Sequence, residues 1–517
     1  MGEKVQIQLR PGLQEDESAI RRATARQLNI AEDRLQTLVV RRRNIDARKR
    51  PIYVLQVEAW VDEAAEPETP WEIPLKDVSN AKPVHIVGLG PAGLFAALRC
   101  IEQGLKPVVI ERGKAVRPRR RDLAALNRDG EVNPESNYCF GEGGAGTFSD
   151  GKLYTRSKKR GNLQRVLDIL VQFGASPDIL VEAHPHIGTN KLPAIIEAMR
   201  EAIIEHGGEV RFNTKLTDLR LTSDTLSHIQ TNGDTWEEID ALILATGHSA
   251  RDIFELLHRH KIDIEAKPFA LGLRVEHPQA VIDSIQYSCG PLRPDGLPAA
   301  AYNLVKQIED RGVYSFCMCP GGIICPASTS NDEVVVNGWS PSKRNTGYAN
   351  SGIVVEVPLA SLNRSDDPLT AMRFQQMVEQ KAFKAGGGKQ QAPATRMTDF
   401  LSGKISGSLP ECSYLPGIVP ADLRQVLPKQ VYRRLQGGFK AFGQRMKGYI
   451  TSEAVVVGVE SRTSSPVRIP RDHKSLMHPQ VKGLFPCGEG AGYAGGIVSA
   501  AMDGERCAVG VGVMYNG

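Results

Sequence analysis

The chain has 517 residues, 41% hydrophobic and 24% charged, which is the composition of a globular protein. Its formal net charge of +5 is too small to indicate nucleic-acid binding by itself. We find neither a signal peptide nor an apolar run near the roughly 20 residues of a membrane-spanning helix, so we expect no membrane partner. Nine scattered cysteines without a C-x-x-C pair predict reduced thiols and a cytoplasmic location.

The first 62 residues have the pattern of a small separate unit. Residues 5–9 alternate as a strand, 15–28 have helical spacing, and 35–43 and 52–61 are typical of two further strands. This order predicts a compact α+β module, and the Glu- and Pro-rich residues 62–82 are typical of a linker.

A basic hairpin is expected between the last two strands of this module. Its charges allow two interpretations: a solvated strand edge that discourages aggregation, or a docking surface for an acidic protein or an RNA backbone. The basic residues are Arg41, Arg42, Arg43, Arg48, Lys49 and Arg50.

Residues 83–113 have the pattern strand, glycine turn, helix, strand and acid. A strand at 84–87 leads into Gly88-Leu89-Gly90-Pro91-Ala92-Gly93, and a second strand at 107–110 ends at Glu111. This is the dinucleotide-binding fingerprint in its required setting. Its glycines permit a tight turn, close approach of a pyrophosphate and close helix–strand packing, while Glu111 can accept a hydrogen bond from a ribose.

Two later strands are expected to return to the same sheet. The buried run 241–245 ends at Thr246-Gly247, after an antiparallel meander over 216–240, and its turn can pass beside the adenosine half of a dinucleotide. Leu216 is either an adenine contact or a core leucine. The other strand is 484–487.

A second glycine-rich segment follows this last strand. Gly488 and Glu489 lie in its turn, and a small-residue helix starts at Gly495, Gly496 and Ile497. Glu489 can accept a hydrogen bond from a sugar hydroxyl. The helix start aims N–H groups at the ligand, where the helix dipole would stabilise negative charge on a reduced flavin.

A third segment, 133–153, holds five glycines between positions 141 and 151. Such a loop lets the backbone lie flat against a planar or phosphorylated ligand. Its apolar residues Phe140, Phe148 and Leu153 can anchor it to a core, which argues against a disordered surface loop. Lys152, next to its last glycine, can stabilise the reduced state of a flavin.

Together these segments resemble the FAD-dependent oxidoreductases with a glutathione-reductase-type FAD domain. They resemble more closely a bacterial group of uncharacterised FAD-dependent dehydrogenase-like proteins that carry a small N-terminal module. Further segments of this resemblance are 184–189, 462–468 and 487–504. Combining the resemblance with the motifs gives the expected FAD-binding residues: Gly88, Gly90, Pro91, Ala92, Gly93, Glu111, Arg112, Gly143, Gly144, Ala145, Gly146, Leu216, Thr246, Gly247, Gly488, Glu489, Gly495, Gly496 and Ile497.

The expected fold is α/β, with a discontinuous Rossmann-like FAD-binding domain, an inserted mixed α/β domain and a small N-terminal α+β module. The module and linker take residues 1–80, and the FAD-binding domain takes 81–261 and 445–517. The inserted substrate domain takes 262–444.

The expected activity is an oxidoreductase that exchanges a hydride between flavin N5 and an unidentified small-molecule substrate. Lys152 and Arg274 are the expected catalytic charge partners, although a buried ion pair explains Arg274 equally well. A second G-x-G-x-x-G and a C-x-x-C are both missing, so we do not expect a disulfide reductase; NAD(P)H stays open as the electron donor. Alternatives are a FAD protein of RNA modification that uses the basic hairpin, or a non-enzymatic scaffold or redox sensor.

Weaker signals accompany these motifs. Cys317 and Cys319 form a C-x-C that lacks zinc spacing, so with Cys325 they are expected in a core or a pocket wall, and we expect no metal. His184 and His186 share a strand face and suit a loop or a substrate contact. For Arg462 and Arg468, a substrate, a flavin phosphate and a structural ion pair are all open as partners.

Overall fold

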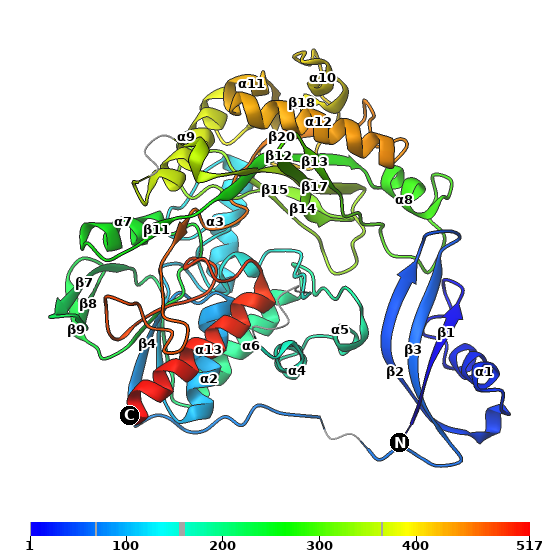
Figure 1. Ribbon diagram of the computed structural model, residues 1–517, viewed down its shortest axis with the longest axis horizontal. Helices are drawn as coiled ribbons and strands as arrows, with labels where there is room; N and C mark the ends of the chain where they lie inside the picture. Colours follow the sequence, from blue (N-terminus) through cyan, green and yellow to red (C-terminus); the bar gives the residue numbers. More distant parts are fainter. Residues whose placement is uncertain (1, 68–69, 155–160, 363–365) are drawn as a thin grey trace.

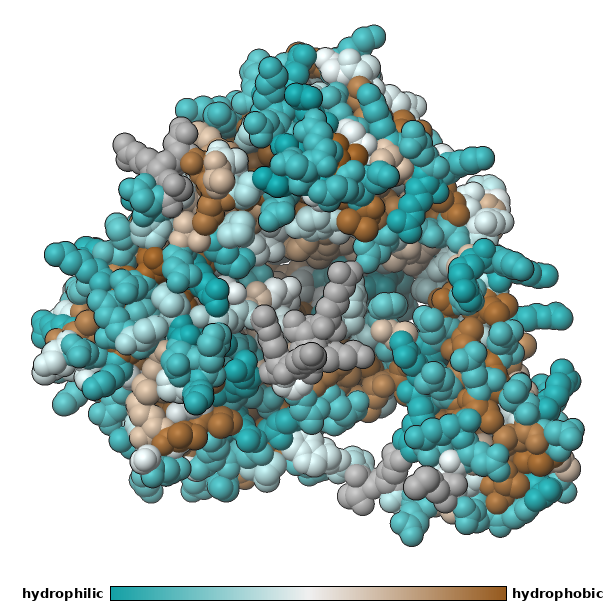
Figure 2. All heavy atoms as spheres, viewed as in Figure 1, coloured by the Kyte–Doolittle hydropathy of each residue, from teal (hydrophilic) through white to brown (hydrophobic). Residues whose placement is uncertain are grey.

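The computed structural model describes residues 2–67, 70–154, 161–362 and 366–517. Figure 1 shows three parts: an N-terminal module at one side, a layer of helices around a parallel sheet, and a second sheet with helices on its outer face. Figure 2 shows mainly hydrophilic residues on this face of the molecule, with hydrophobic residues in small groups. Within the described ranges, no helix combines the length and the apolar character needed to cross a membrane.

The N-terminal module has the β-α-β-β order that its sequence pattern predicts. The central strand β3 pairs antiparallel with both β1 and β2, and α1 covers one face through buried Ala19 and Ile20. Asp16 caps the start of α1 by accepting a hydrogen bond from the Ala19 N–H. The elements are β1 (Glu3–Leu9), α1 (Glu17–Leu28), η1 (Glu32–Arg34), β2 (Leu35–Asp46) and β3 (Ile52–Val61).

The basic hairpin of this module is partly used within the chain. Arg43 is buried and forms ion pairs of 2.8–3.0 Å with Glu15, Asp178 and Glu182, the last two of which belong to the region after the glycine-rich loop. Arg41 pairs with Glu58, and Arg48 with Asp46. Three of the six basic side chains thus neutralise acids of this chain; the partner expected at the hairpin stays a prediction.

The parallel sheet has the order β22-β10-β4-β5-β6. Its strands are short, and all except the half-buried edge strand β6 are almost wholly buried, because a parallel sheet is covered on both faces. Helices α2 and α13 pack together against it, and α6 also contacts α2. The strands are β4 (Pro83–Val87), β5 (Lys106–Ile110), β6 (Glu209–Arg211), β10 (Leu242–Leu244) and β22 (Leu484–Pro486).

The other elements of this part surround the parallel sheet. The predicted meander is present as a separate antiparallel sheet, formed by β7 (Leu216–Thr222), β8 (Thr225–Thr231) and β9 (Thr235–Glu238). The helices are α2 (Pro91–Gln103), α3 (Val116–Asp129), η2 (Gly144–Gly146), α4 (Leu163–Gln172), α5 (Asp178–Val181), α6 (Leu192–Glu205), α7 (Arg251–Arg259) and α13 (Ile497–Asn516).

The second sheet has seven strands in the order β13-β14-β17-β12-β20-β18-β19, antiparallel except for the β18–β19 pair. Helices α9 to α12 lie on its outer face (Figure 1). Its strands are β12 (Phe269–Pro278), β13 (Val305–Ile308), β14 (Arg311–Cys319), β17 (Tyr348–Val357), β18 (Ala392–Arg396), β19 (Ile418–Pro420) and β20 (Val455–Glu460). Its helices are α8 (Gln279–Tyr287), η4 (Leu359–Ser361), α9 (Thr370–Ala385), α10 (Met397–Ser402), α11 (Leu423–Val426) and α12 (Lys429–Arg445).

One boundary expected from the sequence is displaced. The sequence pattern ends the substrate domain at 444, but β20 (Val455–Glu460) pairs with β12 and β18 inside the second sheet. The reason is long-range pairing, which buries β20 on both sides and which no local signal announces. The chain therefore returns to the parallel sheet only after residue 460.

Two short antiparallel pairs complete the structure. The first joins β15 (Ile323–Pro326) to β16 (Val336–Trp339). The second joins β11 (Glu265–Ala266) to β21 (Val467–Arg468), and these two strands lie on the two connections between the parallel sheet and the second sheet.

Candidate functional site

A cavity of about 1290 Å³ opens at the carboxyl ends of β4, β5 and β10 and extends to strand β14 of the second sheet. Ligand crevices of open α/β sheets lie at this edge. The volume exceeds the roughly 300–1,000 Å³ of ordinary small-molecule pockets, so the cavity is large enough for an extended dinucleotide together with a second, smaller molecule.

The glycine turn after β4 has the backbone that the fingerprint requires. Gly88 has φ +103°, and a Cβ on it would lie 2.4 Å from the Ala245 carbonyl oxygen. A Cβ on Gly93 would lie 1.9 Å from the Gly88 carbonyl oxygen, so helix α2 meets β4 too closely for any side chain there. Gly90 differs, because its Cβ would meet only the Gly144 Cα, at 3.9 Å.

The start of helix α2 is open toward the cavity. Its N-cap residue, Gly90, supplies no capping side chain, and Pro91 occupies the first turn. The first N–H groups of an uncapped helix need acceptors, and together with the helix dipole they favour an anion. Gly90 and Pro91 line the cavity, so the arrangement can hold a phosphate.

Glu111 connects three loops at the edge of the cavity. Its carboxylate accepts hydrogen bonds from the N–H groups of Leu89 at 2.9 Å, Gly113 at 2.8 Å and Gly141 at 3.0 Å. A carboxylate offers about four acceptor positions, so one position remains for a ligand hydroxyl. The side chain thus positions the glycine-rich loop and still lines the cavity.

Most of the residues expected to bind FAD lie on the wall of this one cavity, although they come from six separate segments. Gly93, Gly143 and Gly488 are absent from the wall; Gly93 serves helix–strand packing instead. The wall includes Gly88, Gly90, Pro91, Ala92, Glu111, Arg112, Gly144, Ala145, Gly146, Leu216, Thr246, Gly247, Glu489, Gly495, Gly496 and Ile497.

Glu489 lies half-buried in the turn before α13. Burial raises its pKa to about 7, and the Lys267 ammonium only partly opposes this effect. Helix α13 itself starts at Ile497 after Gly496, with no capping side chain. A carboxyl that holds its proton more tightly than usual and an uncapped helix start therefore face the same cavity.

Lys152 reaches the cavity from the glycine-rich loop. Its ammonium lies 2.6 Å from the Asp150 carboxylate, 3.6 Å from the Cys319 sulfur and 3.8 Å from the Cys317 sulfur. Burial alone would lower its pKa, but Cys317, Cys319 and Asp150 outweigh it and raise the pKa. Lys152 therefore carries a permanent positive charge.

Arg274 does not line the cavity. Its side chain is fully buried, and Nε donates to the Glu460 carboxylate at 2.7 Å while Nη1 donates to the Asn350 side chain at 2.6 Å. The buried ion pair that the sequence left open is the one present. The guanidinium also donates to the Cys317 carbonyl oxygen at 3.3 Å, so its closest approach to the cavity is through the backbone of β14.

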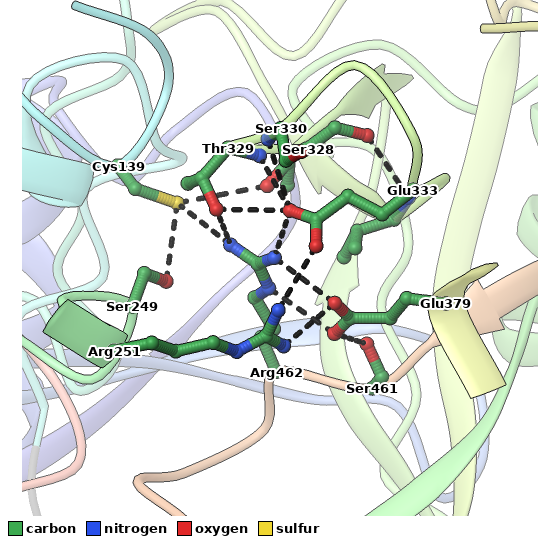
Figure 3. Close-up of polar contacts among 12 residues, drawn as sticks. Cys139, Ser249, Arg251, Ser328, Thr329, Ser330, Glu333, Glu379, Ser461 and Arg462 are labelled. Carbon is green, nitrogen blue, oxygen red and sulfur yellow. Dashed lines mark hydrogen bonds and ion pairs between the residues drawn. The ribbon is translucent and has the colours of Figure 1, made fainter. Parts of the chain in front are cut away.

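Arg462 belongs to a buried network of two arginines and two glutamates (Figure 3). It donates to Glu333 at 2.5 Å and to Glu379 at 3.0 Å, and Arg251 donates to the same carboxylates at 2.9 and 2.7 Å. Burial would raise the pKa of Glu333, but the two guanidiniums outweigh it and lower the pKa to about 2. The network joins α7 and α9 to the segment after β20, and Arg462 also lines the cavity.

Of the other cysteines, histidines and arginines singled out in the sequence, some line the cavity and others do not. Cys317 lines the cavity, whereas Cys319 and Cys325 are buried behind it. His184 lines the cavity beside Tyr154, with ring centroids 5.1 Å apart, but His186 bonds to the Ser342 carbonyl oxygen at 3.1 Å. Arg468 is not on the cavity wall; its guanidinium lies over the Tyr493 ring, 5.0 Å from the ring centroid.

Several side chains of the cavity wall were missed from the sequence. Cys139 lies within the third glycine-rich segment, and His248 and Ser249 follow Thr246-Gly247 directly, so their places in the motifs were available as a signal. Ser249 contacts the Cys139 sulfur at 3.4 Å and the His248 ring at 2.9 Å (Figure 3 shows the first contact). Also missed were Tyr302, Tyr314, Asn337 and Arg344, which carry no motif.

Comparisons with known proteins agree with a flavin-related family. Residues 268–463 match a family described as "FAD-dependent protein, C-terminal domain-like", and residues 1–60 match a domain of unknown function, DUF8436. An uncharacterised protein of Clostridium beijerinckii (strain ATCC 51743 / NCIMB 8052) is 40% identical, over 96% of this chain and 96% of its own length.

Solved structures also align with most of the chain. CtdE in complex with FAD has 11% identity over 84% of both chains, with a TM-score of 0.33. The flavin-dependent brominase Bmp2 has 13% identity over 84% of this chain and 79% of its own, with a TM-score of 0.37. Glycine oxidase from Bacillus cereus ATCC 14579 has 12% identity over 83% and 94%, with a TM-score of 0.31.

Proposed function

The chain belongs to one family with the Clostridium beijerinckii protein and carries the C-terminal domain of FAD-dependent proteins, and from this we propose that it is a FAD-dependent oxidoreductase. In this proposal a hydride passes between flavin N5 and a small-molecule substrate. The observation that carries it is the gathering of glycine turn, glycine-rich loop and α13 start on one cavity. When bound, FAD supplies the two-electron chemistry.

The residues present fit the adenine and pyrophosphate parts of FAD. Gly90 leaves a space that a Cβ would fill, and the uncapped start of α2 offers N–H groups to a pyrophosphate. Glu111 has a free acceptor position for a ribose hydroxyl, and Glu489 can bond to a hydroxyl of the ribityl chain. The five-stranded parallel sheet supports a discontinuous Rossmann-like domain of glutathione-reductase type, interrupted by the second sheet.

The opposite end of the cavity suits the flavin ring and the substrate. The uncapped start of α13, a helix of 20 residues, stabilises negative charge on a ligand next to Gly496 and Ile497. The Lys152 ammonium, held by Asp150, orients a carbonyl or anionic group of the substrate. Tyr302, in the loop before β13, and Tyr314 and Phe316 of β14 exclude water from that end.

Two further parts of the proposal concern the electron donor and the location of the protein. We propose NAD(P)H as a donor that enters the open cavity directly, since the sequence has no second dinucleotide fingerprint. The free state of all nine cysteines supports a cytoplasmic location.

The test has two stages. The purified protein, reconstituted with FAD, is expected to retain flavin through gel filtration, seen as visible absorbance in a one-to-one ratio to protein. Under anaerobic conditions NADH, NADPH and a metabolite panel are then screened for bleaching of that absorbance, with free FAD as the control. Loss of all flavin on the column, or bleaching no faster than with free FAD for every compound, would contradict the proposal.

A further inference from the structure

Strand β14 contains a bulge where it borders the cavity. Phe316 is opposite Gly352 on β17, but Cys319 is opposite Asn350, so three steps along β14 match two along its partner. Cys317, inside the bulge, has φ +45°, in the left-handed region that non-glycine residues seldom adopt. Bulges of this kind re-aim a side chain next to an active site.

The bulge brings the two cysteines of the C-x-C segment to one positive charge. The Lys152 ammonium lies 3.8 Å from the Cys317 sulfur and 3.6 Å from the Cys319 sulfur. The Cys319 sulfur is also 3.3 Å from the Cys317 carbonyl oxygen, so the side chain of Cys319 turns back toward Cys317. A cation beside a thiol favours the thiolate, which is the nucleophilic form.

The two thiols differ in protonation. A hydrogen bond from Cys319 and then the charges of Lys152 and Arg274 lower the pKa of Cys317, and together they outweigh burial and the nearby Asp150 carboxylate. The same hydrogen bond, reinforced by burial, raises the pKa of Cys319. Loss of a proton from the pair is therefore favoured at Cys317.

The two cysteines also differ in access. Cys317 lines the cavity, whereas Cys319 is fully buried and lies behind it. Cys325, on strand β15, is buried as well, and burial raises its pKa. Only Cys317 of these three offers its sulfur to a molecule in the cavity, and Cys319 is positioned to react with it afterwards.

We propose that Cys317 and Cys319 form a redox-active pair that reduces a small disulfide compound held in the cavity. The return of the pair to the dithiol state by reduced flavin rests on the proposed function above. The sequence argued against disulfide reduction because it has no C-x-x-C, but that spacing is not needed where a bulge brings a C-x-C pair together.

The exchange balances in three steps. The Cys317 thiolate attacks one sulfur of the substrate disulfide, forms a mixed disulfide and releases the first product as a thiolate. Cys319 then loses its proton to that departing thiolate and attacks the Cys317 sulfur, which releases the second product and leaves a Cys317–Cys319 disulfide. Two electrons and one proton from the reduced flavin would restore the Cys317 thiolate and the Cys319 thiol, and the second product takes one proton from solvent.

The test uses the full-length protein with its flavin and the small probe 2-hydroxyethyl disulfide. After brief anaerobic exposure, free thiols are blocked, and peptides are mapped by mass spectrometry. The expected product is one peptide containing Cys317 and Cys319 that is lighter by two hydrogens. In Cys319→Ser the probe is expected to remain attached to Cys317 as a mixed disulfide, which the wild type does not accumulate.

Two further variants complete the design. Lys152→Met is expected to slow the reaction at Cys317 by about tenfold or more, because the thiolate loses its cation. Cys289→Ser, a half-buried thiol outside the cavity wall, is the matched control and is expected to react as the wild type does.

The outcomes separate the two proposals. A mixed disulfide on Cys139, which shares the cavity wall, or no modification of Cys317 in Cys319→Ser, would overturn the redox pair even if flavin is bound. Protein without flavin absorbance that still forms the Cys317–Cys319 disulfide would instead contradict the proposed function. When the flavin of the holoenzyme is reduced by light and the probe is then added, the Cys317–Cys319 disulfide should form and take electrons from the flavin. Flavin absorbance is therefore expected to return in the wild type and not in Cys317→Ser, which cannot form that disulfide.

Discussion

A substitution at Gly90 should weaken cofactor binding while leaving the stability of the fold nearly unchanged. In Gly90→Ala the added methyl carbon would lie 3.9 Å from the Gly144 Cα, an ordinary contact distance, and would point into the cavity. The backbone of Gly90, with φ −78° and ψ −173°, is open to alanine. Alanine at the N-cap costs about 1 kcal/mol, and the restricted unfolded chain returns about 0.4–1 kcal/mol, so the free energy of unfolding should stay nearly unchanged.

The cofactor should respond very differently. A methyl group at the position where a pyrophosphate approaches the helix start overpacks the site, which costs roughly 1–3 kcal/mol. That cost corresponds to a dissociation constant for FAD weakened by about 5- to 150-fold. The assay is an equilibrium titration of FAD followed by flavin fluorescence, beside thermal unfolding of the same samples.

Substitutions of two other glycines serve as controls for this experiment. Gly88→Ala should lose stability as well as FAD, because its Cβ would lie 2.4 Å from the Ala245 carbonyl oxygen and its φ is +103°. Gly290→Ala, with open space around an exposed position, should change neither. Unaltered FAD affinity in a folded Gly90→Ala protein would refute a pyrophosphate site at this turn.

Three more predictions concern buried charge. Burial raises the pKa of Glu489 from 4.5 to about 7, so the folded apoprotein binds this proton more tightly than the unfolded chain does. The free energy of unfolding should therefore fall as pH rises through that range, by at most about 3 kcal/mol. Glu489→Gln should abolish that part of the pH dependence in thermal unfolding. Arg462→Met leaves two buried carboxylates with one guanidinium and should cost about 3–5 kcal/mol in urea unfolding, whereas an effect below 1 kcal/mol (about the value of a surface pair) would count against the network. Arg43→Met should speed proteolytic release of the N-terminal module, since it removes ion pairs to Asp178 and Glu182, and Arg50→Met should not.

The sequence was most informative where a structural requirement is local. The turn Gly88–Gly93 is predictable because one backbone conformation and one helix start demand glycine at fixed spacing. The same holds for the N-terminal module, whose alternating and helical patterns lie within 61 residues of each other. Both are present with nearly the expected boundaries.

Features that depend on distant partners were beyond such reasoning. Arg274 pairs with Glu460, which is 186 positions away in the sequence. Because no local pattern announces such a partner, a catalytic role and a buried ion pair had equal support in the sequence. Strand β20 joins the second sheet through pairing with β12 and β18, and its local sequence does not indicate which sheet it joins. The bulge at Cys317 arises from the register between β14 and β17, which only the paired structure reveals.

The pairing of β11 with β21 has a mechanical consequence. The polypeptide passes between the two sheets twice, once on the way out near Glu265–Ala266 and once on the way back near Val467–Arg468, and the two passages are hydrogen-bonded to each other. Lys267, whose charge acts on Glu489, also donates its backbone N–H to the Pro466 carbonyl oxygen at 2.9 Å. The two parts of the protein are thus joined by a two-stranded connection, and neither strand can bend without moving the other.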